Sequence, residues 1–242
     1  MSAEFFYELD FDFRLPTHFL DEAKFSINLL NLITKPILML FILTLITISV
    51  WTLALFLLNF YRDPKRSIPK GNNILSPADG RIIRIIDTSQ ESVSFRKGLF
   101  GKVNTLTKDV ADECYVISIF MSPLDVHYNR SPIDGTVRSI KHSKGKFFKA
   151  YQFEKSMENE KNEILIENKK VKAKVIQIAG FLARRIKCYV KANQKVNKGE
   201  KIGMIALSSQ TTLIIPKIAG LSLKAKTNDR VKAGETVIAV LK

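Results

Sequence analysis

The chain has 242 residues, 46% of them hydrophobic and 25% charged, which is enough apolar material for a buried core and excludes an intrinsically disordered chain. Its two cysteines, Cys114 and Cys188, are too few for a disulfide scaffold and do not form the C-x-x-C pair of a thiolate zinc site. The formal charge of +15 is uneven, because residues 62–242 alone carry +18, a field that attracts nucleic acid or an anionic membrane.

An uncharged apolar segment is the first strong feature along the chain. Residues 19–33 place Phe and Leu side chains near helical spacing, which predicts an amphipathic helix along a membrane interface. Residues 36–61 contain no charged side chain, and a helix needs about 20 apolar residues to cross a bilayer core. The segment has no polar face, which disfavours a helix buried in a soluble protein. We expect one tilted transmembrane helix, with a re-entrant pair that turns near Ser49 as the alternative.

Basic residues on either side of this segment predict its orientation. Within about 15 residues of its ends, fewer basic residues precede the segment than follow it. They are Lys24 and Lys35 before it and Arg62, Lys65, Arg66 and Lys70 after it. By the positive-inside rule, we expect residues 1–61 to form an arm and a cell-membrane anchor, and residues 62–242 to form a domain in the cytoplasm.

Residues 62–242 read as strands and turns. Short runs rich in β-branched residues recur, and turns with Pro, Asp and Gly separate them. The runs are 81–86, 114–121, 163–167, 170–179, 211–216 and 236–240. Residues 180–190 fit either a strand or a short helix. The sequence therefore predicts a mostly β fold, a barrel or sandwich of about 180 residues.

Internal repeats support this fold class. Ser76-Pro-Ala-Asp-Gly80 resembles Ser131-Pro-Ile-Asp-Gly135, and residues 215–223 keep the proline and the glycine of that pattern. Residues 195–202 resemble residues 230–237. Such pairs resemble the hairpin corners of lipoyl and biotinyl domains, where glycine supplies backbone angles closed to other residues. By themselves, these motifs are structural.

The three histidines limit the chemistry of the chain. His18 and His142 lie in polar stretches, which predicts solvated side chains, whereas His127 directly follows an apolar strand and a turn. Three histidines offer too few ligands for a zinc hydrolase, and no H-E-x-x-H, P-loop or G-x-S-x-G motif occurs. We therefore expect no metal site.

Six stretches, taken together and in order, carry a family resemblance. They are 59–66, 76–80, 120–130, 159–160, 177–186 and 198–205. As a set they resemble the small, membrane-anchored, pyruvoyl-dependent phosphatidylserine decarboxylases and the archaeal relatives that act on archaetidylserine. The resemblance covers residues 59–242.

The resemblance implies a carboxy-lyase that converts a phosphatidylserine- or archaetidylserine-type lipid to the ethanolamine lipid. Its cofactor is a covalent pyruvoyl group, made from a serine of the chain, which forms a Schiff base with the substrate amine. In the family, a serine in a Gly-Ser pair attacks the preceding carbonyl, and the chain is cleaved there. Ser209 matches that serine, so we expect cleavage between residues 208 and 209. Ser208 stands where the family has glycine, and attack by Ser208 on Leu207 is the alternative register.

The resemblance also implies roles for four other residues. His127 is the expected general acid and base, with an ordinary pKa near 6.5. Asp79 is expected to orient or activate the reacting groups, either during self-cleavage or after it. Arg130 and Asn129 are the expected substrate-binding residues, and Arg130 is expected to bind the lipid phosphate or the serine carboxylate through its planar guanidinium.

The partners follow from the same resemblance. We expect an anionic membrane and a serine-headgroup lipid, with either a homodimer or a heterodimer of the chain's own α and β fragments. Ser208 supports a second hypothesis, a homologue that does not process itself and acts as a membrane-surface binding module. The apolar segment and the lack of interleaved surface aromatics disfavour a nucleic-acid binder. The residues leave the lipid tail chemistry and the oligomeric state open.

Overall fold

The computed structural model describes residues 17–90, 105–146, 148, 156, 158–180, 185–206 and 209–242. Contacts divide the chain into two compact units, one that ends at Phe56 and one that runs from Leu57 to Lys242. Each unit is described by itself.

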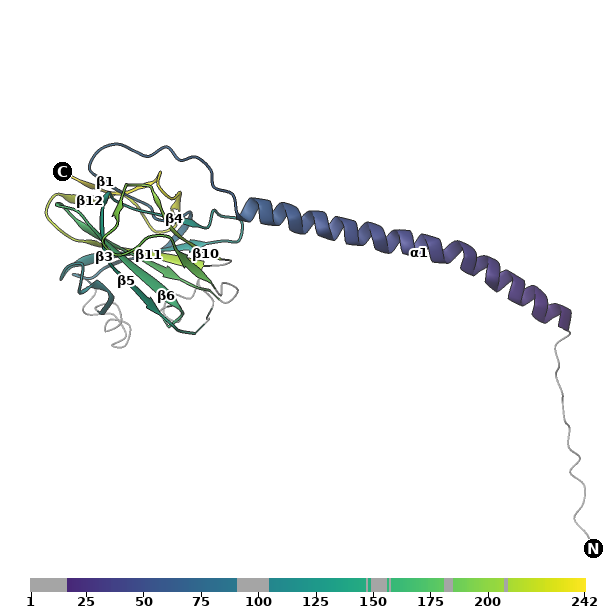
Figure 1. Cartoon of the computed structure of the whole chain (residues 1–242). Coiled ribbons are helices and arrows are strands. Elements are labelled where there is room, and N and C mark those ends of the chain that lie inside the picture. Colours follow the sequence, from purple (N-terminus) through teal and green to yellow (C-terminus); the bar gives the residue numbers. More distant parts are fainter. Residues whose placement is uncertain are drawn as a thin grey trace, which may run out of the picture. The chain divides into compact units, whose positions relative to one another are not determined.

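The first unit is most of the single helix α1 (Thr17–Phe60), the long purple-to-blue ribbon of Figure 1. Its apolar side chains are exposed along the length of the helix, and the segment His18–Phe60 is long and apolar enough to cross a membrane. The expected helix and anchor are therefore one continuous element. Ser49 lies inside it and donates its hydroxyl to the carbonyl one turn earlier, 2.8 Å away, so no re-entrant turn occurs there.

The second unit is built on eight antiparallel strands that form one curled sheet (Figure 1). In their order across the sheet they are β13 (Arg230–Val231), β2 (Gly80–Asp87), β3 (Cys114–Met121), β11 (Ser209–Pro216), β7 (Lys172–Ile178), β6 (Lys161–Glu167), β5 (Gly135–Ser143) and β9 (Lys195–Val196). Strands β3 and β7 flank β11, so the strand that begins at Ser209 lies inside the sheet and not at its edge.

Two smaller antiparallel sheets complete the unit. One contains β1 (Asn73–Leu75), β14 (Val237–Leu241) and β12 (Leu221–Leu223), and the other contains β4 (Tyr128–Arg130), β10 (Lys201–Ile205) and β8 (Ile186–Cys188). The predicted mostly β fold behind an apolar helix is confirmed, and within the stretch 180–190 residues 186–188 form the strand β8.

The repeated motifs fold alike. In each Ser-Pro-x-Asp-Gly motif the serine hydroxyl donates to the backbone carbonyl two residues on, at 2.7 Å for Ser76 and 2.6 Å for Ser131. The glycines of the other repeat, Gly199 and Gly234, have φ angles of 80° and 74°, a region that favours glycine. The Gly199 N–H donates to the Ser131 carbonyl, and the Gly234 N–H donates to the Ser76 carbonyl. Each glycine turn is therefore hydrogen-bonded to one of the two Ser-Pro-x-Asp-Gly turns.

Strand β11 separates two apolar clusters. Leu213 and Ile215 pack into the larger cluster and Ile214 into the smaller one. Because side chains alternate along a strand, Ser209 and Thr211 face the larger cluster, which is the interior of the curled sheet. The site therefore begins where this apolar interior ends.

Candidate active site

Ser209 is fully buried at the first position of β11. It is paired across the sheet with Met121, the last residue of β3, and its hydroxyl lies 3.6 Å from the Met121 sulfur. A thioether is a weak acceptor, so this hydroxyl is poorly satisfied where it stands. Ser208 and Leu207 lie outside the described residues, and so does the expected cleavage bond.

A row of buried polar side chains continues from Ser209 across the sheet. The Asn129 amide donates to the Thr211 hydroxyl at 3.0 Å, and the Gln177 amide donates to the Asn129 oxygen at 2.9 Å. The Asn162 amide in turn donates to the Gln177 oxygen at 2.9 Å. All four residues are buried, and satisfied buried networks of this kind fix side-chain positions. Asn129 thus ties β4 to the strand that carries Ser209.

His127 is buried just before β4, after the turn 122–125. Neither of its ring nitrogens has a hydrogen-bond partner among the described residues, and its ring packs on that of Phe60 with centroids 4.2 Å apart. Burial lowers the pKa of His127 to about 4. The Asp125 backbone, which is close to the ring but outside hydrogen-bond geometry, and the Asp125 charge oppose this shift, and the Arg62 charge adds to it. The imidazole is therefore neutral near pH 7, which differs from the ordinary pKa expected from the sequence.

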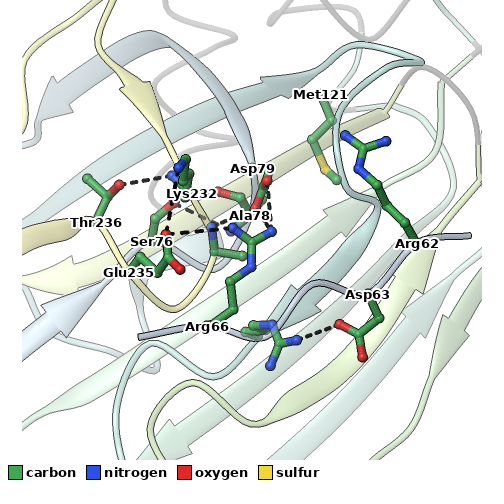
Figure 2. A network of polar contacts seen from close by, with 12 residues as sticks. Arg62, Asp63, Arg66, Ser76, Ala78, Asp79, Met121, Lys232, Glu235 and Thr236 are labelled. Carbon is green, nitrogen blue, oxygen red and sulfur yellow. Dashed lines mark hydrogen bonds and ion pairs between the residues drawn. The ribbon is translucent and has the colours of Figure 1, made fainter. Parts of the chain in front are cut away.

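Asp79 is engaged by an arginine that the sequence analysis did not assign to the site. One terminal nitrogen of Arg66 lies 2.9 Å from both carboxylate oxygens, and the backbone N–H of Ala233 donates to one of them at 2.8 Å (Figure 2). Arg66 also lies 3.9 Å from Glu235, and only 5% of its side chain is exposed. Asp79 has no described hydrogen bond to His127, so the two side chains are not joined in this structure.

Arg130 is also in an ion pair. Its guanidinium donates to the Asp63 carboxylate at 2.6 Å and to the Gly199 carbonyl at 2.9 Å. These contacts join the segment after α1 to the turn before β10. The substrate-binding roles of Arg130 and Asn129 stay predictions.

Three segments meet at Asn129. The Pro77 carbonyl in the turn that carries Asp79 is 3.4 Å from the Asn129 amide. Ile205 is the last residue of β10 and lies four residues before Ser209. Its backbone N–H donates to the His127 carbonyl at 3.3 Å. The structure thus brings the turn of Asp79, the strand after His127 and the strand of Ser209 into one region, although no described hydrogen bond links His127 to Ser209.

Several residues of this region carry no role in the sequence analysis. Arg62 and Arg66 lie in the stretch 59–66, and Gln177 opens the stretch 177–186, so membership of those motifs was the available signal. Met121 lies in the stretch 120–130 in the same way, whereas Thr211 lies in none of the six stretches, because its importance comes from its contact with Asn129 on another strand.

The described chain thus combines a long apolar helix with a mostly β unit that encloses a serine and a histidine. A model of the phosphatidylserine decarboxylase family matches residues 53–239. A protein of Methanocaldococcus jannaschii, provisionally named archaetidylserine decarboxylase proenzyme, is 46% identical over 196 residues, which is 80% of this chain and 93% of that protein. Phosphatidylserine decarboxylase proenzymes of Chlorobium limicola and Prosthecochloris aestuarii are 39% and 40% identical, over 77% and 82% of this chain and 80% and 85% of their own lengths. The chain belongs to the phosphatidylserine decarboxylase family, which confirms the resemblance.

Proposed function

We propose that this protein decarboxylates a phosphatidylserine- or archaetidylserine-type lipid to the ethanolamine lipid, using a pyruvoyl group made from Ser209. The match to the family over residues 53–239, which include Ser209 and His127, carries the proposal. A pyruvoyl group supplies a carbonyl electron sink for the electrons released when CO₂ leaves. The buried start of β11 suits such a group, because Ser209 is fully enclosed and meets a sulfur instead of water.

Self-processing needs only atoms of the chain and one water molecule, which the last step consumes. The Ser209 Oγ attacks the carbonyl carbon of residue 208, the peptide C–N bond breaks, an ester C–O bond forms, and the hydroxyl proton ends on the new amine. Loss of the Ser209 Cα proton then expels residue 208 as a carboxylate. Hydrolysis with loss of ammonia leaves the pyruvoyl group at the new N-terminus. A serine hydroxyl needs a neighbouring base to act as this nucleophile.

His127 is the proposed base. It is neutral near pH 7 because its pKa is lowered to about 4. Neither ring nitrogen has a partner that meets hydrogen-bond geometry among the described residues, so the unprotonated nitrogen of the neutral ring is free to accept a proton. We assign Asp79 an orienting role, since its carboxylate holds Arg66 and the Ala233 backbone beside the turn that contacts Asn129.

The two fragments of a processed chain are expected to remain associated. Residues 209–216 pair with β3 on one side and with β7 on the other, and both neighbours belong to the larger fragment. The fragments would therefore form one domain as an αβ pair. The basic residues after α1 support a cytoplasmic position for this domain.

Ser208 favours a second candidate, a homologue that binds the membrane surface without processing itself. The family pattern has glycine before the attacking serine, and glycine permits backbone angles that serine avoids. This candidate predicts one intact chain and no decarboxylation.

The test is CO₂ release from a serine lipid labelled in its carboxyl group, measured with the full chain in detergent. We expect His127→Asn to lower the rate by about 10²- to 10⁴-fold, which is typical of a lost general acid or base. His142→Asn is the matched control, since His142 is half exposed and pairs with Glu160. No release from the wild-type chain, or equal rates for His127→Asn and wild type, would reject the proposal.

A further inference from the structure

The three arginines that gather around the site differ in their partners. Arg66 pairs with Asp79 and Arg130 pairs with Asp63. Arg62 is in no ion pair among the described residues, and in Figure 2 no dashed line joins it to a carboxylate. Arg62 is therefore the one of the three whose positive charge is not neutralised within the described protein.

The Arg62 side chain is nevertheless held in place. One terminal nitrogen donates to the Asn59 carbonyl at 2.7 Å and to the Asn59 side-chain oxygen, and the other donates to the Leu124 carbonyl at 2.7 Å. These contacts use neutral oxygens only. They leave the Nε–H group and one N–H of the second terminal nitrogen without a described partner. Adjacent N–H groups of a fixed guanidinium suit an oxyanion.

The surroundings of Arg62 point to the same kind of ligand. The guanidinium lies near enough to His127 for its charge to help lower the pKa of that imidazole, whose two nitrogens also lack described partners. Leu124, whose carbonyl holds Arg62, has a side chain that is 67% exposed. An exposed leucine beside an unpaired arginine suits a surface that meets both acyl chains and headgroups.

The chain also fixes the depth at which Arg62 lies. It follows α1 by two residues, after an apolar segment long enough to cross a bilayer. The end of such a segment lies at the level of the lipid headgroups. A serine lipid presents two oxyanions, the phosphodiester and the serine carboxylate. The phosphodiester is the one nearer the acyl chains, and it is only a few bonds from the carbon that loses CO₂.

We propose that Arg62 binds the phosphodiester of the substrate headgroup, at the membrane surface, and so presents the serine end to the buried site. This inference rests on the proposed function for the identity of the lipid. It moves phosphate recognition from Arg130, which pairs with Asp63, to Arg62, which has no carboxylate partner in the part of the chain that the structure describes.

Binding is tested with the full Ser209→Ala chain in detergent, because this variant cannot process itself. The probes are glycerophosphoserine, glycerophosphoethanolamine and free serine, measured by calorimetry. Adding Arg62→Gln should weaken the binding of both phosphodiesters by at least about tenfold, the size expected for a lost charge-assisted hydrogen bond. Lys65→Gln is the matched control, since it removes the same charge from an exposed position three residues along.

The outcomes separate the alternatives. Equal affinity with and without Arg62 overturns the inference, and so does a loss confined to glycerophosphoserine, because that pattern marks the carboxylate as the ligand. If the glutamine variant does not fold, Arg62→Lys decides: weaker binding of both phosphodiesters supports the inference, and unchanged binding overturns it. Arg62-dependent binding in a chain that releases no CO₂ would uphold the inference while rejecting the proposed function.

A second readout separates binding from a structural role. Self-cleavage needs no substrate, so Arg62→Gln in the wild-type chain should still yield both fragments while raising KM for the lipid about tenfold. Loss of self-cleavage together with a lower melting temperature would show that Arg62 only supports the fold, and would overturn the inference.

Discussion

Ser209 and His127 are both fully enclosed, and each is poorly satisfied there. Among the described residues, the serine hydroxyl contacts a thioether sulfur, and neither imidazole nitrogen has a hydrogen-bond partner. Leaving polar atoms in this state costs free energy, which the surrounding sheet and the polar row through Asn129 must offset. Such a site is typical of enzymes, because polar groups that do not hydrogen-bond to one another remain available to react with a substrate or a peptide bond.

The buried histidine predicts a pH dependence of stability. Its pKa is about 4 when folded and near 6.5 when unfolded, so between these values the unfolded chain binds more protons. The stability that His127 confers is complete above about pH 6.5 and is lost as the pH falls toward 4. We expect the free energy of unfolding to fall more steeply over this window for wild type than for His127→Asn, as measured by denaturant titration. Parallel curves would mean that the imidazole is not buried in its neutral form.

The strands and turns were predicted mainly from the residues that favour turns and from the β-branched runs between them. The repeats at Ser76 and Ser131 predicted two similar corners, and the structure has the same hydroxyl contact in both. The runs at 114–121 and 211–216 predicted strands but not their pairing, which depends on contacts between distant residues. For the same reason, a single sequence could not predict the ion pair between Arg66 and Asp79 or the hydrogen bond between Gln177 and Asn129.

One glycine shows how closely these elements fit beside the site. A Cβ on Gly80 would lie within van der Waals radii of the Phe120 carbonyl, next to Met121, whereas a Cβ on Gly71 would meet only the Asn73 side chain at 4.0 Å. Both glycines have positive φ, 146° and 97°, so alanine is strained at both by on the order of 1–3 kcal/mol.

We therefore expect Gly80→Ala to be destabilised more than Gly71→Ala by about 1–3 kcal/mol, the usual cost of overpacking. It should also slow self-cleavage, because Phe120 and Met121 support Ser209. Unfolding curves and the rate of fragment formation measure the two effects. Equal behaviour of the two variants would contradict this close packing.

At the scale of the whole molecule, the chain combines an apolar helix with a strongly basic domain. Residues 62–242 carry a formal charge of +18, which favours anionic lipid even without the helix. The helix is long and apolar enough to cross a membrane, and the attachment of such a helix does not weaken with salt. Phe60 belongs to the β unit, since it is 2% exposed and packs on His127. A deletion of the apolar helix must therefore stop before Leu57, where this unit begins.

Deletion of residues 2–56 should therefore leave a folded domain with a membrane attachment that depends on charge. We expect the truncated chain to leave the membrane pellet at high salt, while the full chain stays until detergent is added. Sedimentation at increasing salt measures this. Release of the full chain by salt alone would exclude a membrane span.

The intact mass of the membrane-extracted chain tests the central claim, that Ser209 becomes the catalytic group. We expect the 27.5 kDa chain to divide after residue 208, giving a 34-residue fragment of about 4 kDa with a borohydride-sensitive N-terminus. Ser209→Ala should remain whole, and Ser208→Gly should be cleaved at least as fast as wild type, because glycine relieves the backbone while keeping the attacked carbonyl. A single species at full mass, without carbonyl reactivity, would contradict the account and favour the homologue that does not process itself.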